Sequence, residues 1–127
     1  MNSVQECEYN LKKENFWLLQ NILFTFEGEY ETRLDDAIKR MKEDEPEAGE
    51  IEPGPVRRFG ETLSGILSNV RLHVRDCELC RKNYRNYVDG QRRDYRSMNN
   101  VFRKAGMKTK IDEIDSLDPD FLGLYVH

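Results

Sequence analysis

The sequence predicts an all-α protein, an elongated helical bundle, on three observations. Apolar residues recur at steps of three and four along most of the chain. One short apolar run, residues 22–26, also suits a strand, but it has no partner strand elsewhere. The composition, 38% hydrophobic and 35% charged, fits an elongated helical protein best. We therefore expect two long antiparallel helices, a third helix and a short C-terminal helical tail, all within a single domain over residues 1–127.

The first long helix is predicted over residues 4–42. Ser3 followed by Glu6 is a capping-box pattern, which places the helix start at Val4. The positions that follow step by three or four and are apolar except for Asn15: Leu11, Asn15, Leu18, Ile22, Phe26, Tyr30, Leu34 and Ile38. This pattern fits one continuous helix or two helices joined near Gly28.

The second long helix is predicted over residues 56–89. It follows an acidic segment rich in proline and glycine, residues 43–55, which reads as a solvated linker. Its apolar seam consists of residues at alternating spacings of four and three, namely Phe59, Leu63, Ile66, Val70, His73, Cys77, Cys80, Tyr84 and Tyr87. Asp89-Gly90 is the first interruption that the sequence indicates. A third helix over 91–105 should then stop at Gly106.

The C-terminal tail is apolar. Asp118-Pro119 predicts the start of a last helical piece, which carries Phe121, Leu122, Leu124 and Tyr125. These four side chains either dock on the bundle or reach a binding partner, and the sequence leaves both readings open.

The composition also predicts a compartment. The chain shows no apolar run long enough to span a membrane and no signal-peptide pattern in its first ten residues, so we expect a cytoplasmic protein, or a nuclear one in a eukaryote. Three cysteines, an odd number, argue against a secreted disulfide scaffold. They favour free thiols or thiolates that bind metal.

His73, Cys77 and Cys80 form an H-x3-C-x2-C pattern within the buried seam. Imidazole nitrogen and thiolate sulfur are the ligands that Zn²⁺ prefers. In an unbroken helix, however, His73 and Cys80 would lie about 10.5 Å apart along the axis, which strains their reach to one ion. A helix break before Cys77 would relieve this, although no glycine or proline marks one. Cys7 is the best candidate for a fourth ligand, since the first helix must pack on this seam.

Three interpretations of this cluster follow from the residues. Cysteine is often buried as a small hydrophobe, so the cluster fits simple core packing with His73 hydrogen-bonded inside. It also fits one structural zinc ion held by His73, Cys77, Cys80 and Cys7. A redox or catalytic thiol is the third interpretation.

The run from Val70 to Tyr84, with His73, Cys77 and Cys80 at its centre, resembles the H-x3-C-x2-C motif of the zinc-binding anti-sigma factor family. The resemblance covers about fifteen residues. It implies that these three residues are zinc ligands, and that a small helical domain binds a bacterial sigma factor. The chain departs from the family pattern because no fourth ligand stands at the usual modest distance upstream.

Charge is segregated along the chain despite a net charge of −4. Residues 1–56 carry a net −8, residues 57–110 a net +9, and residues 111–127 a net −5. Within the basic middle, helical spacing places a ridge opposite the apolar seam, made of Arg71, Arg75, Lys82, Arg85, Arg92, Arg96 and Arg103. This ridge predicts contacts with phosphates or with an acidic protein partner. It is also what a solvated helix face shows, and the acidic flanks could cover it within the chain.

The sequence contains none of the phosphate-loop, dinucleotide-binding, zinc-protease or serine-nucleophile motifs, so we predict no catalytic residues and no enzymatic activity. The leading hypothesis is a small regulatory protein that binds a protein of the transcription machinery, with no cofactor or one structural zinc. A nucleic-acid-binding protein that uses the arginine ridge is the second hypothesis. The third is a self-assembling helical structural protein, for which a homodimer is the simplest form.

Overall fold

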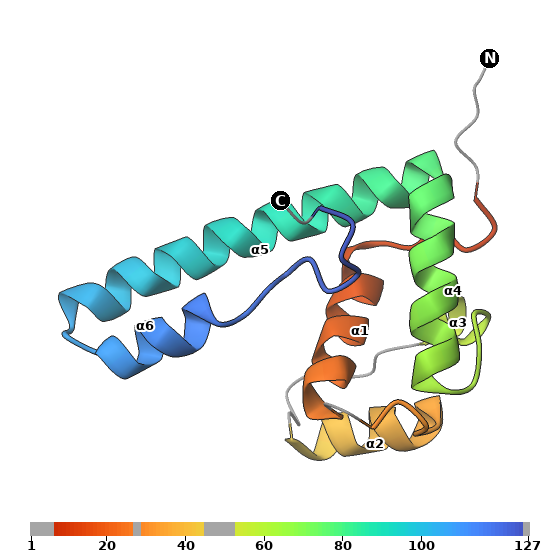
Figure 1. The fold of residues 1–127 in the computed structure, drawn as a ribbon, viewed down its shortest axis with the longest axis horizontal. Coiled ribbons are helices and arrows are strands. Elements are labelled where there is room, and N and C mark those ends of the chain that lie inside the picture. The colour runs from red at the N-terminus through yellow and green to blue at the C-terminus, as the bar shows by residue number, and fades with distance from the viewer. Residues whose placement is uncertain (1–6, 27–28, 45–52, 126–127) are drawn as a thin grey trace.

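The computed structural model of the chain describes residues 7–26, 29–44 and 53–125, and within these ranges every regular element is a helix (Figure 1). The helices are α1 (Lys13–Thr25), α2 (Leu34–Asp44), α3 (Gly54–Arg57), α4 (Leu63–Asp76), α5 (Glu78–Lys104) and α6 (Lys108–Asp115). The predicted all-α class is confirmed. None of the helices in the described ranges has the length and apolarity that a membrane crossing needs.

The long helix α5 organises the molecule. It packs against α4 and α1 near its beginning and against α6 near its end, while α1 also packs on α2 and α3 on α4. In Figure 1 the far half of α5 and α6 form a hairpin that projects from the rest of the fold, and the chain after α6 runs back to the region where α1 meets α5. The two ends of α5 therefore have different surroundings, one inside the body and one at the tip of the hairpin.

The buried core lies where α1, α4 and the first half of α5 meet. From α1 it contains Phe16, whose ring lies edge-on to that of Tyr84 in α5 at 5.1 Å between centroids. The predicted seam contributes as well, because fully or nearly fully buried side chains fall at Phe59, Leu63, Ile66, Val70, Cys80, Tyr84 and Tyr87. The apolar periodicity thus identified the face that helix packing covers.

The first predicted helix is shorter than expected and is divided in two. The capping pattern at Ser3 and Glu6 lies outside the described residues, and residues 7–12 are not helical, so α1 begins at Lys13. Of the two alternatives for the region, the structure has two helices, because α1 ends at Thr25 and α2 begins at Leu34. The segment that enters α2 bonds to the loop before α4, through Leu34 N to Glu61 O at 2.7 Å.

The second predicted helix breaks at a different place from the one indicated by glycine. α4 ends at Asp76, and Cys77 takes an extended conformation (φ −94°, ψ 114°) between α4 and α5. The prediction of an interruption at Asp89-Gly90 was wrong, since α5 continues through both residues. A single glycine weakens a helix by only about 1 kcal/mol, which neighbouring packing overcomes. Gly106 takes a left-handed conformation (φ 72°) just after α5, as expected of a helix stop.

Gly60 and Gly90 should respond in opposite ways to alanine. A Cβ at Gly60 would approach Ile66 N to 3.3 Å on a backbone with φ near 158°, so Gly60→Ala should destabilise the protein by about 1–3 kcal/mol. At Gly90, inside α5, a Cβ would meet nothing within 4 Å, so Gly90→Ala should stabilise by about 0.5–1 kcal/mol. Urea unfolding of the two variants checks both signs. A stabilised Gly60→Ala or a destabilised Gly90→Ala contradicts the backbone assignment.

The C-terminal tail docks on the bundle, which was one of its two predicted roles. Leu122 is 2% exposed within the core, and Phe121, Leu124 and Tyr125 pack against the core's edge. The anchor is the carboxylate of Asp120, which is 3% exposed and accepts hydrogen bonds from Tyr84 Oη at 2.5 Å and from two backbone N–H groups of the tail. Partner binding through these tail residues stays a prediction.

Candidate metal centre

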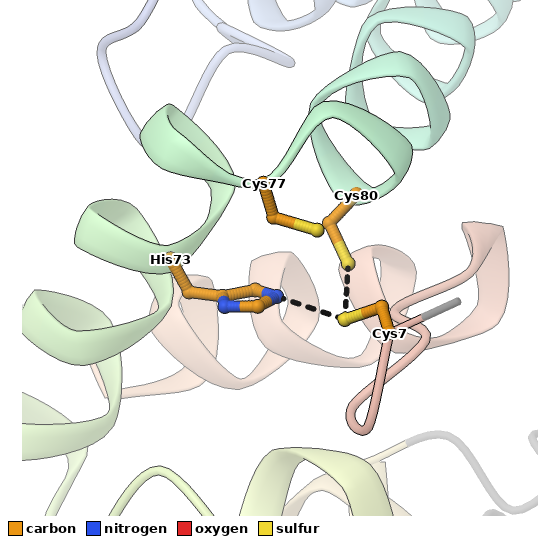
Figure 2. A group of neighbouring side chains, drawn as sticks. All are labelled: Cys7, His73, Cys77 and Cys80. Carbon is orange, nitrogen blue, oxygen red and sulfur yellow. Dashed lines mark hydrogen bonds between the residues drawn. The ribbon is translucent and has the colours of Figure 1, made fainter. Parts of the chain in front are cut away.

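Four potential metal ligands converge where three segments of the chain meet (Figure 2). Cys7 comes from the segment before α1, His73 from the last turn of α4, Cys77 from the junction, and Cys80 from the first turn of α5. Their ligand atoms, three sulfurs and one imidazole nitrogen, all lie within 4.8 Å of one another. The structure therefore brings together the four residues that the sequence singled out, in an arrangement close enough to hold a metal ion.

Two distances from Cys7 Sγ are slightly shorter than those expected between ligands of one zinc ion. Cys7 Sγ lies 3.2 Å from His73 Nε2 and 3.6 Å from Cys80 Sγ. Around a tetrahedral Zn²⁺, bond lengths of about 2.3 Å to sulfur and 2.1 Å to nitrogen give separations of about 3.8 Å between sulfurs and about 3.6 Å between sulfur and nitrogen. The sulfurs are also too far apart for a disulfide, and all three cysteines are free thiols.

The junction between α4 and α5 explains how the pattern can converge. With Cys77 extended, α5 leaves α4 in a new direction, so the seven residues between His73 and Cys80 no longer follow one helix axis. The strain predicted for an unbroken helix is therefore absent. Cys77 is both the C-cap of α4 and the N-cap of α5.

The segment that carries Cys7 is held by backbone contacts to the sulfurs. Asn10 adopts a left-handed conformation (φ 45°), which asparagine tolerates better than most residues, and its N–H donates to Cys7 Sγ at 3.4 Å. The N–H of Leu11 donates to Cys80 Sγ, also at 3.4 Å. Asn83 Nδ2 donates to Leu11 O at 2.9 Å and fixes the same segment on α5. Donors of this kind orient ligand atoms and stabilise thiolate charge.

The thiols differ in their tendency to ionise. Burial raises the pKa of Cys80 to about 12, and the sulfurs of Cys7 and Cys77 act in the same direction. Burial also opposes ionisation of Cys7, but the backbone N–H groups of Asn10 and Tyr9, together with the two other thiols, outweigh it and lower its pKa. A cation bound among the sulfurs would displace the protons, because metals bind the thiolate form.

His73 is placed as a neutral ligand. Burial lowers the pKa of its imidazole, against the opposing charge of Asp76, so the ring is uncharged at neutral pH and has a free lone pair. Aromatic rings cover it on two sides, with Tyr9 edge-on at 4.9 Å and Phe59 at 5.5 Å between centroids. Tyr9 was not singled out from the sequence, since its only signal is its place two residues after Cys7.

The predicted basic ridge is divided by the junction at Cys77. Arg71 and Arg75 lie on α4, the other five members lie on α5, and Arg75 pairs with Asp76 at 3.3 Å. On α5, Lys82 is exposed, and Arg85 lies over the ring of Tyr125 at 5.4 Å. The remaining three members, Arg92, Arg96 and Arg103, line a cavity between α5 and α6.

The acidic flanks neutralise the start of the basic region but not α5. Ion pairs join Arg57 to Asp35 at 2.6 Å and Arg58 to Glu8 at 4.0 Å. Helix α5 carries eight basic and three acidic residues, and in the part of the chain that the structure describes none of the eight has a carboxylate within 4 Å. The C-terminal acidic flank does lie over this ridge, since residues within 114–119 line the cavity with Arg92, Arg96 and Arg103, but within the described ranges it forms no ion pair with α5.

Comparison with family models, with curated proteins and with solved structures found no match. The resemblance to the zinc-binding anti-sigma factors accordingly rests on His73, Cys77 and Cys80 alone. The site has to be interpreted from its own chemistry.

Proposed function

We propose that the chain is a non-enzymatic regulatory protein, fastened by a structural zinc ion, that binds a macromolecular partner, namely a protein of the transcription machinery. The observation that carries the zinc part is the convergence of Cys7, His73, Cys77 and Cys80 within 4.8 Å. The local resemblance to the anti-sigma factors supports the choice of partner.

The ligand set favours a structural role over a catalytic one. Structural zinc sites use four protein ligands, often with three or four cysteines, whereas catalytic sites keep one position for water or substrate. Three sulfurs and one nitrogen from the chain would complete the tetrahedron. The ion would then join the segment before α1 to the α4–α5 junction across 66 residues of sequence.

The projecting hairpin offers the surface for a protein partner. Near the tip of the hairpin three apolar side chains are exposed, Met98 by 44%, Val101 by 64% and Met107 by 42%. Met98 and Val101 lie one turn apart on α5, among the basic residues described above. Methionine and arginine are enriched at protein interfaces, where an apolar centre is surrounded by polar and charged groups.

Affinity purification from the source cell tests the partner. We expect the wild-type chain to retain a component of the transcription machinery, and Val101→Glu to reduce its recovery at least tenfold, because a buried unpaired carboxylate is costly at an apolar contact. Leu72→Glu is the matched control, since Leu72 is 50% exposed but lies on α4. Equal recovery with Val101→Glu, or no component of this kind with the wild type, contradicts the proposal.

Nucleic-acid binding is the second candidate function, favoured by the eight basic residues of α5 that lack ion pairs in the described structure. If α5 contacts phosphates, the affinity for a labelled duplex or single strand should fall steeply between about 50 and 200 mM salt, since binding releases counterions. Fluorescence anisotropy measures this. No binding at the lower salt concentration removes the candidate, and light scattering in parallel tests the predicted homodimer.

A further inference from the structure

A cavity of about 450 Å³ lies between the second half of α5 and the segment formed by α6 and the residues after it. Its volume is within the range of small-ligand sites, about 300–1,000 Å³. The cavity is remote in sequence from the four metal ligands and includes none of them. The cavity is therefore a candidate binding site separate from the metal centre.

Three guanidinium groups give the cavity its charge. Arg92, Arg96 and Arg103 line it, at helical positions that share one face of α5. Within the described residues none of the three has a carboxylate within 4 Å, and Arg103 only reaches Asn100 Oδ1, at 3.5 Å. Guanidinium groups bind phosphate through paired, charge-assisted hydrogen bonds.

The two carboxylates in the lining are already used by the fold. Asp115 Oδ1 accepts from Asn99 Nδ2 at 2.6 Å, and Asp118 Oδ1 accepts from the N–H of Asp120 at 2.9 Å. These bonds fix α6 and the tail in place. Both acids keep their charge, but neither lies within 4 Å of an arginine, and the three guanidinium groups outnumber them in the lining.

Asn99 supplies a second and independent indication of a ligand. It is only 9% exposed and lines the cavity, yet its Oδ1 has no hydrogen-bond partner among the described residues. The carboxamide cannot be turned round, because only its amino group can donate to the carboxylate of Asp115. The oxygen itself is buried beneath the cavity wall, and a buried acceptor left without a donor is costly, so a ligand hydroxyl or N–H that reaches it after a small movement of the carboxamide would be favourable.

We propose that this cavity binds a small phosphate monoester that carries a hydroxyl group near the phosphate, that is, a sugar phosphate. The phosphate contacts the guanidinium groups of Arg96 and Arg103, with Arg92 beside them. A sugar hydroxyl donates to Asn99 Oδ1, which a small movement of the carboxamide brings to the cavity surface. The ligand is a free small molecule, and a nucleic-acid strand that merely follows the charge of α5 is the competing case.

Titration calorimetry on the full chain tests the proposal with ribose 5-phosphate, inorganic phosphate and ribose as probes. We expect saturable binding of ribose 5-phosphate, weaker binding of inorganic phosphate and none of ribose. Arg96→Gln/Arg103→Gln should weaken both phosphate ligands by roughly a hundredfold, at about tenfold for each charged hydrogen bond lost. The matched control, Arg93→Gln/Lys104→Gln, removes the same charge from α5 outside this cavity and should change affinity less than twofold.

Asn99→Ala separates the hydroxyl contact from the charge. Because the loss of Nδ2 also frees the Asp115 carboxylate, both phosphate ligands should weaken, and ribose 5-phosphate should weaken by a further factor of roughly five, as expected for one neutral hydrogen bond. Should this variant fail to fold, the side-chain amide resonance of Asn99 in the wild-type protein gives the same answer, since it should shift with ribose 5-phosphate and not with ribose. Absence of saturable binding overturns the proposal. Equal losses of affinity in Arg96→Gln/Arg103→Gln and in its control Arg93→Gln/Lys104→Gln overturn it as well. So does binding of a single-stranded oligonucleotide without binding of ribose 5-phosphate.

Discussion

Replacing Cys77 and Cys80 together with alanine is expected to abolish stoichiometric zinc and to lower the melting temperature by about 15 °C. An ion present at about a thousand times its dissociation constant adds about 4 kcal/mol to the stability of the folded state. For a chain of this length, each kcal/mol corresponds to about 4 °C. Elemental analysis of protein purified without chelator, together with thermal unfolding before and after chelation, measures both effects.

His73→Gln and His127→Gln form a matched pair for the same site, because they change the two histidines of the chain one at a time. His73→Gln should lose most of the zinc affinity, whereas His127→Gln should bind zinc as the wild type does. Wild-type protein without zinc, combined with an unchanged melting temperature in the double cysteine variant, would show that the cluster is ordinary core packing.

The zinc affinity should also depend on pH in a defined direction. Burial holds the pKa of Cys80 near 12 in the absence of metal, so binding at neutral pH has to release its proton. The affinity should therefore fall as the pH is lowered from 8 to 6. Titration with a competing chelator at several pH values measures the slope, and a flat profile contradicts thiolate ligation.

Asp120→Ala is expected to be the second large perturbation, with a loss of about 3 kcal/mol in the free energy of unfolding. The change removes a carboxylate that accepts from the Tyr84 hydroxyl and from the N–H groups of Leu124 and Tyr125. Buried donors left without an acceptor each cost about 1–3 kcal/mol, and the partial exposure of the two N–H groups keeps the sum at the lower end.

Hydrogen exchange should locate this effect in the tail. In Asp120→Ala the amides of residues 121–125 should exchange much faster, while those of α4 keep their protection. Asp112→Ala is the control, since Asp112 is exposed on α6 and its loss should change stability by less than about 0.5 kcal/mol. Equal stability of the two variants in urea would show that Asp120 does not anchor the tail.

The helical class and the buried seam could be predicted because both follow from local periodicity. Residues such as Phe59, Ile66 and Tyr84 repeat at the helical spacing, and packing buries whichever face is apolar. The metal candidates could be named for the same reason, since three lie on that seam. Cys7 required only the further expectation that the first helical region packs there.

The break at Cys77 could not be predicted from the residues around it. No glycine or proline marks it, and its partners lie far away in the sequence, where Leu11 contacts both Cys80 and Asn83. Likewise, Asn99 and Asp120 stand in charge-rich stretches whose usual fate is the surface. They are buried only because α6 and the tail fold back onto α5. The residues around Asn99 and Asp120 do not indicate this packing.

The one-residue junction makes α5 a lever. With about 1.5 Å per residue, the 27 residues of α5 reach roughly 40 Å from Cys77 to the tip of the hairpin. A rotation of about ten degrees at this hinge would move the tip by about 7 Å over such a length. A metal ion held by His73 before the junction and Cys80 after it would fix the angle between α4 and α5, together with the buried Tyr84 and Tyr87, and so the position of the exposed Val101. Binding or loss of a metal ion at the cysteine sulfurs would therefore displace the tip of the hairpin.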